Sequence, residues 1–468
     1  MTLPSRWPAI LQAVMTGQPR ALADSHYPQW HAAPVTGLMN DPNGFIWFAG
    51  RYHLFYQWNP LDCEHRFKCW GHWSSADLVH WQHEPLALMP DEAYDRNGCY
   101  SGSAVDNEGV LTLCYTGNVK FDDGSRTAWQ CLAVDQPDGT FRKLGPVLAL
   151  PEGYTGHVRD PKVWQHEGMW YMVLGAQDVQ KRGKVLLFKS ADLHAWTSCE
   201  EIAGHGVNGL TDAGYMWECP DLFALDGTHV LICCPQGLAR EPHRYLNTYP
   251  ATWMSGAFDY ARATFDHGEL HELDAGFEFY APQTTLAEDG RRILIGWMGV
   301  PDGEEMLQPT RAHGWMHQMT CPRELRFRDG RLWQTPAREL AALREDEQHW
   351  QGRASDAPEL DATRLEFELS ASQVNVDFGG ALRLMVDEQG IRLERASLKT
   401  GETLTRYWQG DVRHLRVLCD RSSVEIFINH GEGVMSSRYF PDHPAWVRFE
   451  GASDITLRYW SLRACMIE

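Results

Sequence analysis

Three acidic residues occur at intervals that indicate a common role, and each is followed within two residues by a proline. They are Asp41, Asp160 and Glu218. With Ser101 and Tyr280 they form a series of five positions, here called the anchors, that lie 60, 59, 58 and 62 residues apart. Glycoside hydrolysis needs two carboxylic groups beside one bond, one to attack or to activate water and one to protonate the leaving oxygen. The acids therefore predict acid–base chemistry on a sugar if the fold brings them together.

The sequence neighbours of the acids predict a different role for each. Apolar neighbours such as Trp217 are expected to raise the pKa of Glu218 by desolvation, whereas Asp41 lies among asparagines and is expected to remain ionised. Arg159 is expected to hold the adjacent Asp160 as an anion. We therefore predict that Asp41 is the nucleophile, Glu218 the general acid/base and Asp160 a fixed carboxylate that binds sugar hydroxyls. A single acid before a strand is usually a turn or capping residue, but three at matching phases of one repeat favour function.

The spacing of the anchors predicts how the fold brings them together. Each anchor is followed by a turn and an apolar β-type run, and a repeat of about 60 residues holds four strands, which is one blade of a β-propeller. Five repeats between residues 31 and 334 predict five blades. The innermost strand of each blade lines the central channel, so the acids should converge at its mouth. Proline withholds a backbone donor, so we expect the anchors at the entry of these strands.

The remaining sequence divides into three shorter parts. Residues 1–30 predict an N-terminal extension with a short helical pattern from Trp7 to Val14, and residues 335–346 predict a helical linker. From residue 347 to 468 the alternation of apolar and polar residues returns in several short runs, which is typical of an antiparallel β-sandwich. The predicted fold is therefore all-β, a five-bladed β-propeller followed by a C-terminal β-sandwich.

Composition limits the partners and the compartment. A formal net charge of −20 argues against nucleic acid or an anionic membrane as a partner. The twelve cysteines include no C-x-x-C pair, so we expect reduced, buried thiols rather than disulfides. The sequence shows no signal-peptide pattern and no apolar run of membrane-spanning length. We expect a soluble cytoplasmic protein, and nothing in the sequence indicates its oligomeric state.

The motifs around the acids resemble a known family. The ordered set N-D-P-N-G, R-D-P and E-C-P resembles glycoside hydrolase family 32, which includes invertases, fructanases and bacterial sucrose-6-phosphate hydrolases. The resemblance extends along nearly the whole chain and is greatest to bacterial cytoplasmic members. Further motifs that carry it are Phe55-Tyr-Gln-Trp-Asn-Pro60, Cys69-Trp-Gly-His-Trp73, Tyr100-Ser-Gly-Ser103, Phe279-Tyr-Ala-Pro-Gln283 and Asp420-Arg-Ser-Ser-Val-Glu-Ile-Phe427.

The resemblance implies a reaction and a set of binding residues. It implies a retaining β-fructofuranosidase that acts on sucrose or sucrose 6-phosphate, with Asp41 forming a covalent fructosyl intermediate, Glu218 as acid/base and Asp160 as transition-state stabiliser. It implies no metal and no organic cofactor. The positions implied in binding the sugar are Leu38, Met39, Asn40, Gln57, Tyr100, Ser101, Arg159 and Trp297.

One position departs from the family pattern, and several basic residues remain candidates for a phosphate contact. Many relatives carry a tryptophan where this chain has Glu64-His65, which affects fine specificity rather than the reaction. The basic turn from residue 181 to 184 is most simply a solvated turn. The candidates for a substrate phosphate are this turn, Arg66, Lys68, Arg126 and Arg244.

A glycine-rich segment and a group of histidines have simpler explanations than a nucleotide or metal site. The segment from Gly204 to Gly209 matches G-x-G-x-x-G, but no helical pattern follows, so we expect a loop and no nucleotide site. Four histidines between residues 65 and 83 fit no common metal-ligand spacing, and we expect hydrogen-bonding roles for His72 and His80. Two alternative functions stay open, namely fructosyl transfer to an acceptor sugar and a catalytically silent sugar-binding propeller.

Overall fold

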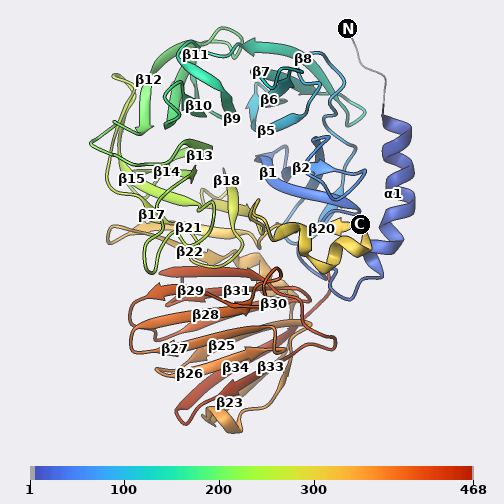
Figure 1. Cartoon of the computed structure of the whole chain (residues 1–468), viewed down its shortest axis with the longest axis vertical. Helices are drawn as coiled ribbons and strands as arrows, with labels where there is room; N and C mark the ends of the chain where they lie inside the picture. Colours follow the sequence, from blue (N-terminus) through green and yellow to red (C-terminus); the bar gives the residue numbers. More distant parts are fainter. Residues whose placement is uncertain (1–5, 466–468) are drawn as a thin grey trace.

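Seven β-sheets make up most of the protein. The computed structural model describes residues 6–465, so residues 1–5 and 466–468, at the outer ends of the predicted extension and sandwich, lie outside the described part. Five sheets are arranged around a centre as the blades of a β-propeller, and two six-stranded sheets pack below it as a β-sandwich (Figure 1). The predicted fold class is confirmed.

Each blade consists of consecutive antiparallel strands. Blade one is closed by a short strand from much later in the chain, β20, which pairs in parallel with β1. The strands are, in blade one, β1 (Gly37–Phe48), β2 (Arg51–Asn59), β3 (Cys69–Ser75), β4 (Trp81–His83) and β20 (Trp315–Met316); in blade two, β5 (Cys99–Asn107), β6 (Val110–Lys120), β7 (Arg126–Asp135) and β8 (Phe141–Leu148); in blade three, β9 (Tyr154–His166), β10 (Met169–Asp178), β11 (Gly183–Ser190) and β12 (Thr197–Gly204); in blade four, β13 (Met216–Leu225), β14 (Thr228–Gln236), β15 (Thr252–Asp259), β16 (Thr264–His267) and β17 (His271–Glu272); and in blade five, β18 (Tyr280–Leu286), β19 (Arg292–Trp297), β21 (Arg323–Arg328) and β22 (Arg331–Pro336).

The first strands of the five blades form the inner ring. Strands β1, β5, β9, β13 and β18 each contact the first strand of both neighbouring blades, so the ring is closed. In blades one to four a two-residue turn follows this strand, and both turn residues have positive φ, as in Ala49-Gly50 and Asp226-Gly227. Such turns match the twist of a hairpin and favour glycine at the second position. The predicted turns between the first and second strands are confirmed there.

Four of the five anchors lie inside the inner strands, whereas Tyr280 is the first residue of β18. In every blade the pairing of the first and second strands shifts register at the anchor, for example between Met39 and Pro42, and between Glu218 and Asp221. A β-bulge of this kind re-aims a side chain and tolerates a proline, because one residue leaves the hydrogen-bonded ladder. The expectation of a strand entry is therefore wrong for the three acids and Ser101. Asp160 itself has a positive φ of 67°.

The C-terminal domain is a sandwich of two antiparallel sheets with one apolar core between them. The first sheet contains, in spatial order, β23 (Arg344–Arg353), β34 (Asp454–Leu462), β25 (Arg364–Ser370), β30 (Leu415–Asp420), β31 (Ser423–Ile428) and β32 (Gly433–Arg438), and the second contains β24 (Leu360–Asp361), β33 (Trp446–Glu450), β26 (Val374–Phe378), β27 (Leu382–Asp387), β28 (Gly390–Ala396) and β29 (Thr403–Gln409). Four 3₁₀ turns lie between strands: η1 (Glu305–Leu307), η2 (Pro309–His313), η3 (Arg338–Leu343) and η4 (Ala354–Asp356).

A fully buried charge network joins the two domains. Arg323 of blade five donates to Asp274 and, at 2.7 Å, to Glu425 of the sandwich. Glu425 also contacts Nε2 of His31 at 2.9 Å, and Nδ1 of that ring lies 3.0 Å from Asp420. The D-R-S-S-V-E motif therefore supplies two acids, Asp420 and Glu425, that attach the sandwich to the start of the propeller.

The N-terminal helix is longer than the sequence pattern predicts. It runs from Trp7 to Leu22 (α1) and lies along the outer side of the propeller (Figure 1). The pattern ends at Val14 because a glycine and a proline follow, but both are accommodated. Pro19 lies in the last turn, and Gly17 packs so closely on Thr36 that a Cβ would clash. No helix among residues 6–465 combines the length and apolar character needed to cross a membrane. Among residues 6–465 no disulfide joins the twelve cysteines, of which eleven are buried and Cys199 is half-buried.

Candidate active site

The anchor side chains of all five blades line one cavity of about 320 Å³ at the inner ring. Asp41, Asp160 and Glu218 converge there from blades one, three and four. The full set of lining residues is Asn40, Asp41, Gln57, His65, Lys68, Tyr100, Ser101, Arg126, Arg159, Asp160, Glu218, Gln236, Tyr249, Tyr280, Trp297 and Pro301.

The structure brings nine of the eleven predicted site residues into this cavity. Besides the three acids these are Asn40, Gln57, Tyr100, Ser101, Arg159 and Trp297. Leu38 and Met39 do not line it, because β1 is buried on both faces and their side chains pack into cores on either side of the strand. We therefore leave Leu38 and Met39 out of the binding set.

Sequence reasoning missed three polar or aromatic residues of the cavity wall. Tyr280 was identified as an anchor but given no role, while Gln236 and Tyr249 were not singled out. A signal for Gln236 exists in the repeat, since residues near the ends of the second strands recur at steps of 60, 60, 59 and 61 residues, namely Gln57, Gly117, Gln177, Gln236 and Trp297. Tyr249 lies in an irregular segment between β14 and β15, outside this series.

Asp41 is half-buried and held by three donors. It accepts hydrogen bonds from Ser101 Oγ at 2.5 Å and Asn40 Nδ2 at 3.0 Å, and the Cys219 thiol lies at 3.6 Å. Burial raises the pKa of Asp41, and the nearby charge of Glu218 adds to the rise, against the lowering effect of Ser101 and Asn40. The polar neighbours thus act as expected, but they do not keep the carboxyl at its ordinary pKa.

Glu218 has four short hydrogen bonds. Arg159 donates to Oε1 through Nε at 2.9 Å and Nη2 at 2.7 Å, while Tyr280 and Gln236 donate to Oε2 at 2.6 and 2.8 Å. Burial acts to raise the pKa of Glu218, but Arg159 and these hydrogen bonds outweigh it and lower the pKa. The expected rise in the pKa of Glu218 is therefore wrong, because the guanidinium of Arg159 contacts Glu218 instead of Asp160.

Asp160 is a buried carboxyl group of the cavity with a raised pKa. Its Oδ2 accepts from the backbone N–H of Cys219 at 3.0 Å, and the thiol of Cys219 is 3.6 Å away. Burial raises the pKa of Asp160 to about 7, with the charges of Glu218 and Asp41 adding to the effect and Arg159 opposing it. The expectation of a fixed anion is thus corrected, since near neutral pH this group is close to half protonated.

His65 belongs to a chain of polar contacts behind Asn40. Lys68 Nζ donates to Asn40 Oδ1 at 2.5 Å and lies 2.9 Å from His65 Nδ1. His65 Nε2 lies 3.0 Å from Glu305, which also contacts His317 Nε2 at 3.2 Å. Burial and the charge of Lys68 lower the pKa of His65 to about 4, so the ring is neutral and accepts from Lys68. His65 also lies near the indole of Trp297, with ring centroids 6.0 Å apart, and so forms part of the wall.

Two further sequence expectations concern metals and nucleotides. The side chains of His65, Glu305 and His317 are a possible set of metal ligands, with donor atoms within 4.8 Å of one another, although hydrogen bonds already connect them. His72 contacts His53 at 3.0 Å and His80 contacts Asp77 at 2.7 Å, as expected of hydrogen-bonding residues. The G-x-G-x-x-G segment after β12 is a loop, as predicted.

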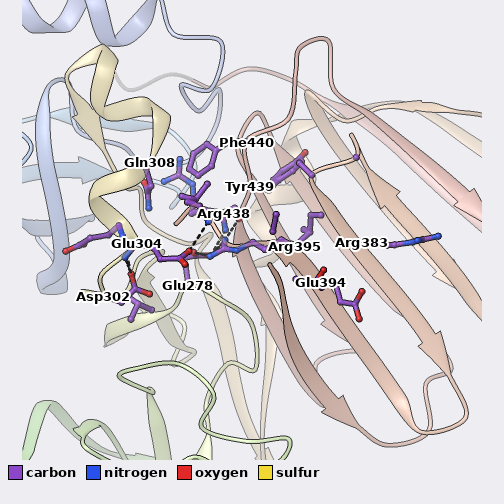
Figure 2. A pocket seen from close by; sticks show the side chains of 18 of the residues that line it. Glu278, Asp302, Glu304, Gln308, Arg383, Glu394, Arg395, Arg438, Tyr439 and Phe440 are labelled. Atoms are coloured by element: carbon purple, nitrogen blue, oxygen red, sulfur yellow. Dashed lines mark hydrogen bonds and ion pairs between the residues drawn. The ribbon is translucent and has the colours of Figure 1, made fainter. Parts of the chain in front are cut away.

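A second cavity of about 430 Å³ lies between the propeller and the sandwich (Figure 2). Glu278 from the propeller side forms an ion pair with Arg395 and accepts from the backbone N–H of Arg438 at 2.8 Å. These contacts hold the two domains together, and none of the anchors lines this cavity. The cavity at the inner ring is therefore the candidate active site.

Comparison with protein families gives two matches that together cover most of the chain. The model described as glycosyl hydrolases family 32 N-terminal domain matches residues 31–336. The model described as glycosyl hydrolases family 32 C terminal matches residues 353–461.

Individual relatives are similar over their full length. The chain is 70% identical to the sucrose-6-phosphate hydrolase of Salmonella typhimurium, over 100% of both chains. Among solved structures it is similar to a sucrose-6-phosphate hydrolase from Lactobacillus gasseri, with 31% identity, a TM-score of 0.89 and 97% of both chains covered. It is also similar to a Bombyx mori GH32 beta-fructofuranosidase mutant in complex with sucrose, with 32% identity, a TM-score of 0.87 and 98% of both chains covered.

Proposed function

Because the chain belongs to glycoside hydrolase family 32, we propose that it hydrolyses the β-fructofuranosyl bond of sucrose or sucrose 6-phosphate. The observation that carries this proposal is the convergence of three carboxyl groups from three blades in one cavity, with Asp160 buried and Asp41 and Glu218 half-buried. A sugar-binding module without activity has no need for three mutually repelling acids, whose partial removal from water costs free energy. Relatives named for sucrose 6-phosphate hydrolysis support the choice of substrate.

In the proposed reaction Asp41 attacks the anomeric carbon of the fructosyl unit. Asn40 donates to Oδ1 of Asp41 and Ser101 to Oδ2, so the orientation of the attacking carboxylate is fixed. Glu218 gives its proton to the leaving oxygen, and glucose or glucose 6-phosphate departs. Glu218 then takes a proton from water, which displaces Asp41 and releases fructose. Two displacements at one carbon give net retention of configuration.

Arg159 controls the proton that this mechanism requires. Its ion pair lowers the pKa of Glu218 and so favours the ionised form. A fructosyl hydroxyl group that accepts from Arg159 would weaken this ion pair, and the pKa of Glu218 would rise, since burial then dominates. Asp160, with its pKa of about 7, donates or accepts a hydrogen bond to a sugar hydroxyl. Substrate binding thus prepares the acid for its role.

The test is release of fructose from sucrose and from sucrose 6-phosphate, with wild type beside three variants. We expect Asp41→Ala and Glu218→Ala to lose at least three orders of magnitude in kcat with an unchanged fold. Asp106→Ala is the matched control, because Asp106 lies on an inner strand but is exposed and contacts only a turn amide. Near-normal activity in either cavity variant contradicts the assignment.

Two alternatives differ in their products. Fructosyl transfer gives oligosaccharides at high sucrose concentration, whereas a silent binding protein gives no product at all. Product analysis by chromatography separates these outcomes from hydrolysis. We also propose that the enzyme works in the cytoplasm, since twelve free thiols suit a reducing compartment. Cell fractionation checks this.

A further inference from the structure

Three cations line the active-site cavity, and their charges are balanced differently. Arg159 forms an ion pair with Glu218 at 2.7 Å. Lys68 is buried, and the charges of Asp41 and Glu305 act to raise its pKa, although burial prevails and lowers it to about 8. Arg126 has no carboxylate within ion-pair distance among residues 6–465. Arg126 is therefore the lining cation whose charge is available to an anionic ligand.

The contacts of Arg126 are made by neutral groups. Nη2 donates to Asn118 Oδ1 at 2.5 Å, and Nη1 lies 3.3 Å from Nδ1 of His157. The Nε–H is buried and has no partner. His157 also accepts from Arg159 at 3.0 Å, and burial together with these two arginines lowers the pKa of His157 to about 4, so the ring contributes no positive charge.

This arrangement leaves the positive charge of Arg126 poorly compensated. Burial lowers the pKa of Arg126, and repulsion from Arg159 adds to the effect. The negative charge of a dianion beside Arg126 would offset both the burial and the repulsion from Arg159, because an opposite charge favours the charged form of the guanidinium. The planar guanidinium matches the geometry of phosphate oxygens better than a lysine ammonium does.

Position also separates Arg126 from the residues around the fructosyl unit. The three acids lie on the first strands of their blades, whereas Arg126 begins β7, the third strand of blade two. It therefore reaches the cavity from outside the inner ring, where its guanidinium lies 5.9 Å from the ring of Tyr100. A leaving group that extends from the scissile bond toward the rim would pass this pair.

The other basic candidates from the sequence are placed elsewhere. Arg66 is 69% exposed and bonded to Asp62, and Arg244 is bonded to Glu241 beside a different cavity. In the turn from residue 181 to 184, Lys184 forms an ion pair with Glu201. None of these lines the active-site cavity.

We propose that Arg126 recognises the phosphate of a phosphorylated sugar substrate and sets the preference for it over the neutral sugar. This rests on the proposed hydrolase function and adds the ligand class, a phosphate monoester on the leaving group, and the residue that binds it. Lys68 donates to Asn40, which belongs to the residues assigned to the fructosyl unit. Both substrates contain this unit, so Lys68 is not expected to distinguish them.

The experiment measures kcat/KM for sucrose 6-phosphate and for sucrose in wild type, Arg126→Gln and Arg96→Gln. Arg96 is the matched control, because it is an exposed cation of the same blade that donates to the backbone of Lys120 and does not line the cavity. We expect Arg126→Gln to reduce the ratio of kcat/KM for sucrose 6-phosphate to kcat/KM for sucrose about 10- to 100-fold, as when a charge-assisted hydrogen bond is lost. Arg96→Gln should keep the wild-type ratio.

A second measurement does not depend on turnover of the phosphorylated substrate. Glucose 6-phosphate should inhibit sucrose hydrolysis by wild type more strongly than glucose does, and Arg126→Gln should remove this difference. A wild-type ratio in Arg126→Gln, an equal drop in Arg96→Gln, or a wild-type enzyme without preference for the phosphorylated sugar would each overturn the proposal. All three leave the hydrolase function intact, whereas a wild-type enzyme inactive on both sugars contradicts the proposed function itself.

Discussion

Arg159 donates two hydrogen bonds to Glu218, 59 residues further along the chain, and none to its immediate neighbour Asp160. Adjacent residues of a regular strand point to opposite sides, but the register shift at Asp160 interrupts this alternation, and both side chains line the same cavity. The guanidinium lowers the pKa of Glu218, while burial raises that of Asp160 to about 7 against the lowering effect of Arg159.

Tyr280→Phe tests whether hydrogen bonds set the pKa of the acid. The phenol donates to Glu218 Oε2 at 2.6 Å and helps to lower its pKa, so its loss should raise that pKa. The proton of Glu218 is then retained to higher pH, and the alkaline limb of the kcat/KM profile should move up by about one pH unit. Tyr249→Phe is the control, since Tyr249 lines the same cavity without a hydrogen bond to Glu218. An unmoved alkaline limb in Tyr280→Phe refutes this role.

Asp160→Asn should stabilise the fold at high pH. The folded pKa of about 7 exceeds the ordinary value of 3.8, so folding takes up a proton between these pH values. The stability due to this group is complete below about pH 4 and is lost as the pH rises through 7. Asparagine stays neutral, so the variant should gain about 2 to 4 kcal/mol at pH 8 and little at pH 4.5.

Thermal unfolding of wild type and Asp160→Asn at pH 4.5 and pH 8 measures this difference. Asp106→Asn is the control, because this exposed aspartate lies on an inner strand without sharing the cavity. Equal shifts in Tm at the two pH values would show that Asp160 is not destabilised by ionisation. Loss of activity in the same variant is expected and does not enter this comparison.

A substrate with a leaving group that needs no proton separates the roles of Glu218 and Asp41. With β-fructofuranosyl fluoride, Glu218→Ala should form the covalent intermediate at a rate within about tenfold of wild type, since protonation is no longer required. Asp41→Ala should remain inactive on both substrates. Fluoride release in a burst, followed by slow turnover that azide accelerates, checks this. If Glu218→Ala is as inactive on the fluoride as on sucrose, its role is not that of the acid.

The sequence repeat predicts the fold well because its strands and turns are specified by local residue patterns. Strands are marked by apolar runs and the turns between them by residues such as Asp226-Gly227, which require positive φ. The period of about 60 residues then places the anchors on one ring. Edge elements such as β29 carry no such signal, because their residues are half exposed. The helix beyond Val14 likewise depends on packing of Gly17 against Thr36, a contact that the local sequence does not reveal.

The site is predicted less completely, because its electrostatics depend on directions and not on spacing. The sequence places Arg159 next to Asp160, yet the bulge directs the side chain to Glu218. The sequence also predicts an ionised Asp160, but burial in the folded chain raises its pKa to about 7. Leu38 belongs to the same motif as Asn40, so the sequence gives no reason to treat them differently. In the structure β1 is buried on both faces, and the side chain of Leu38 packs in an apolar core instead of lining the cavity. Such orientations are properties of the folded chain.

Arg323→Met should show how strongly the buried network holds the domains together. Arg323 is fully buried between Asp274 and Glu425, so its loss leaves Asp274 without a counter-charge and Glu425 paired with His31 alone, and should cost about 3 to 5 kcal/mol. Arg326→Met is the matched control on the same strand, because Arg326 is 65% exposed and its pair with Asp226 contributes less than about 1 kcal/mol.

Thermal unfolding followed by tryptophan fluorescence measures the loss of stability in Arg323→Met and in Arg326→Met. The rate of fructose release measures whether the active-site cavity still works. The carboxylates left by Arg323→Met take up protons as the pH falls, so the loss in Tm should be greater at pH 8 than at pH 5. A Tm within 2 °C of that of Arg326→Met at both pH values would mean that the network does not stabilise the interface. If Tm falls while kcat per folded molecule is unchanged, the sandwich supports the propeller without taking part in the reaction.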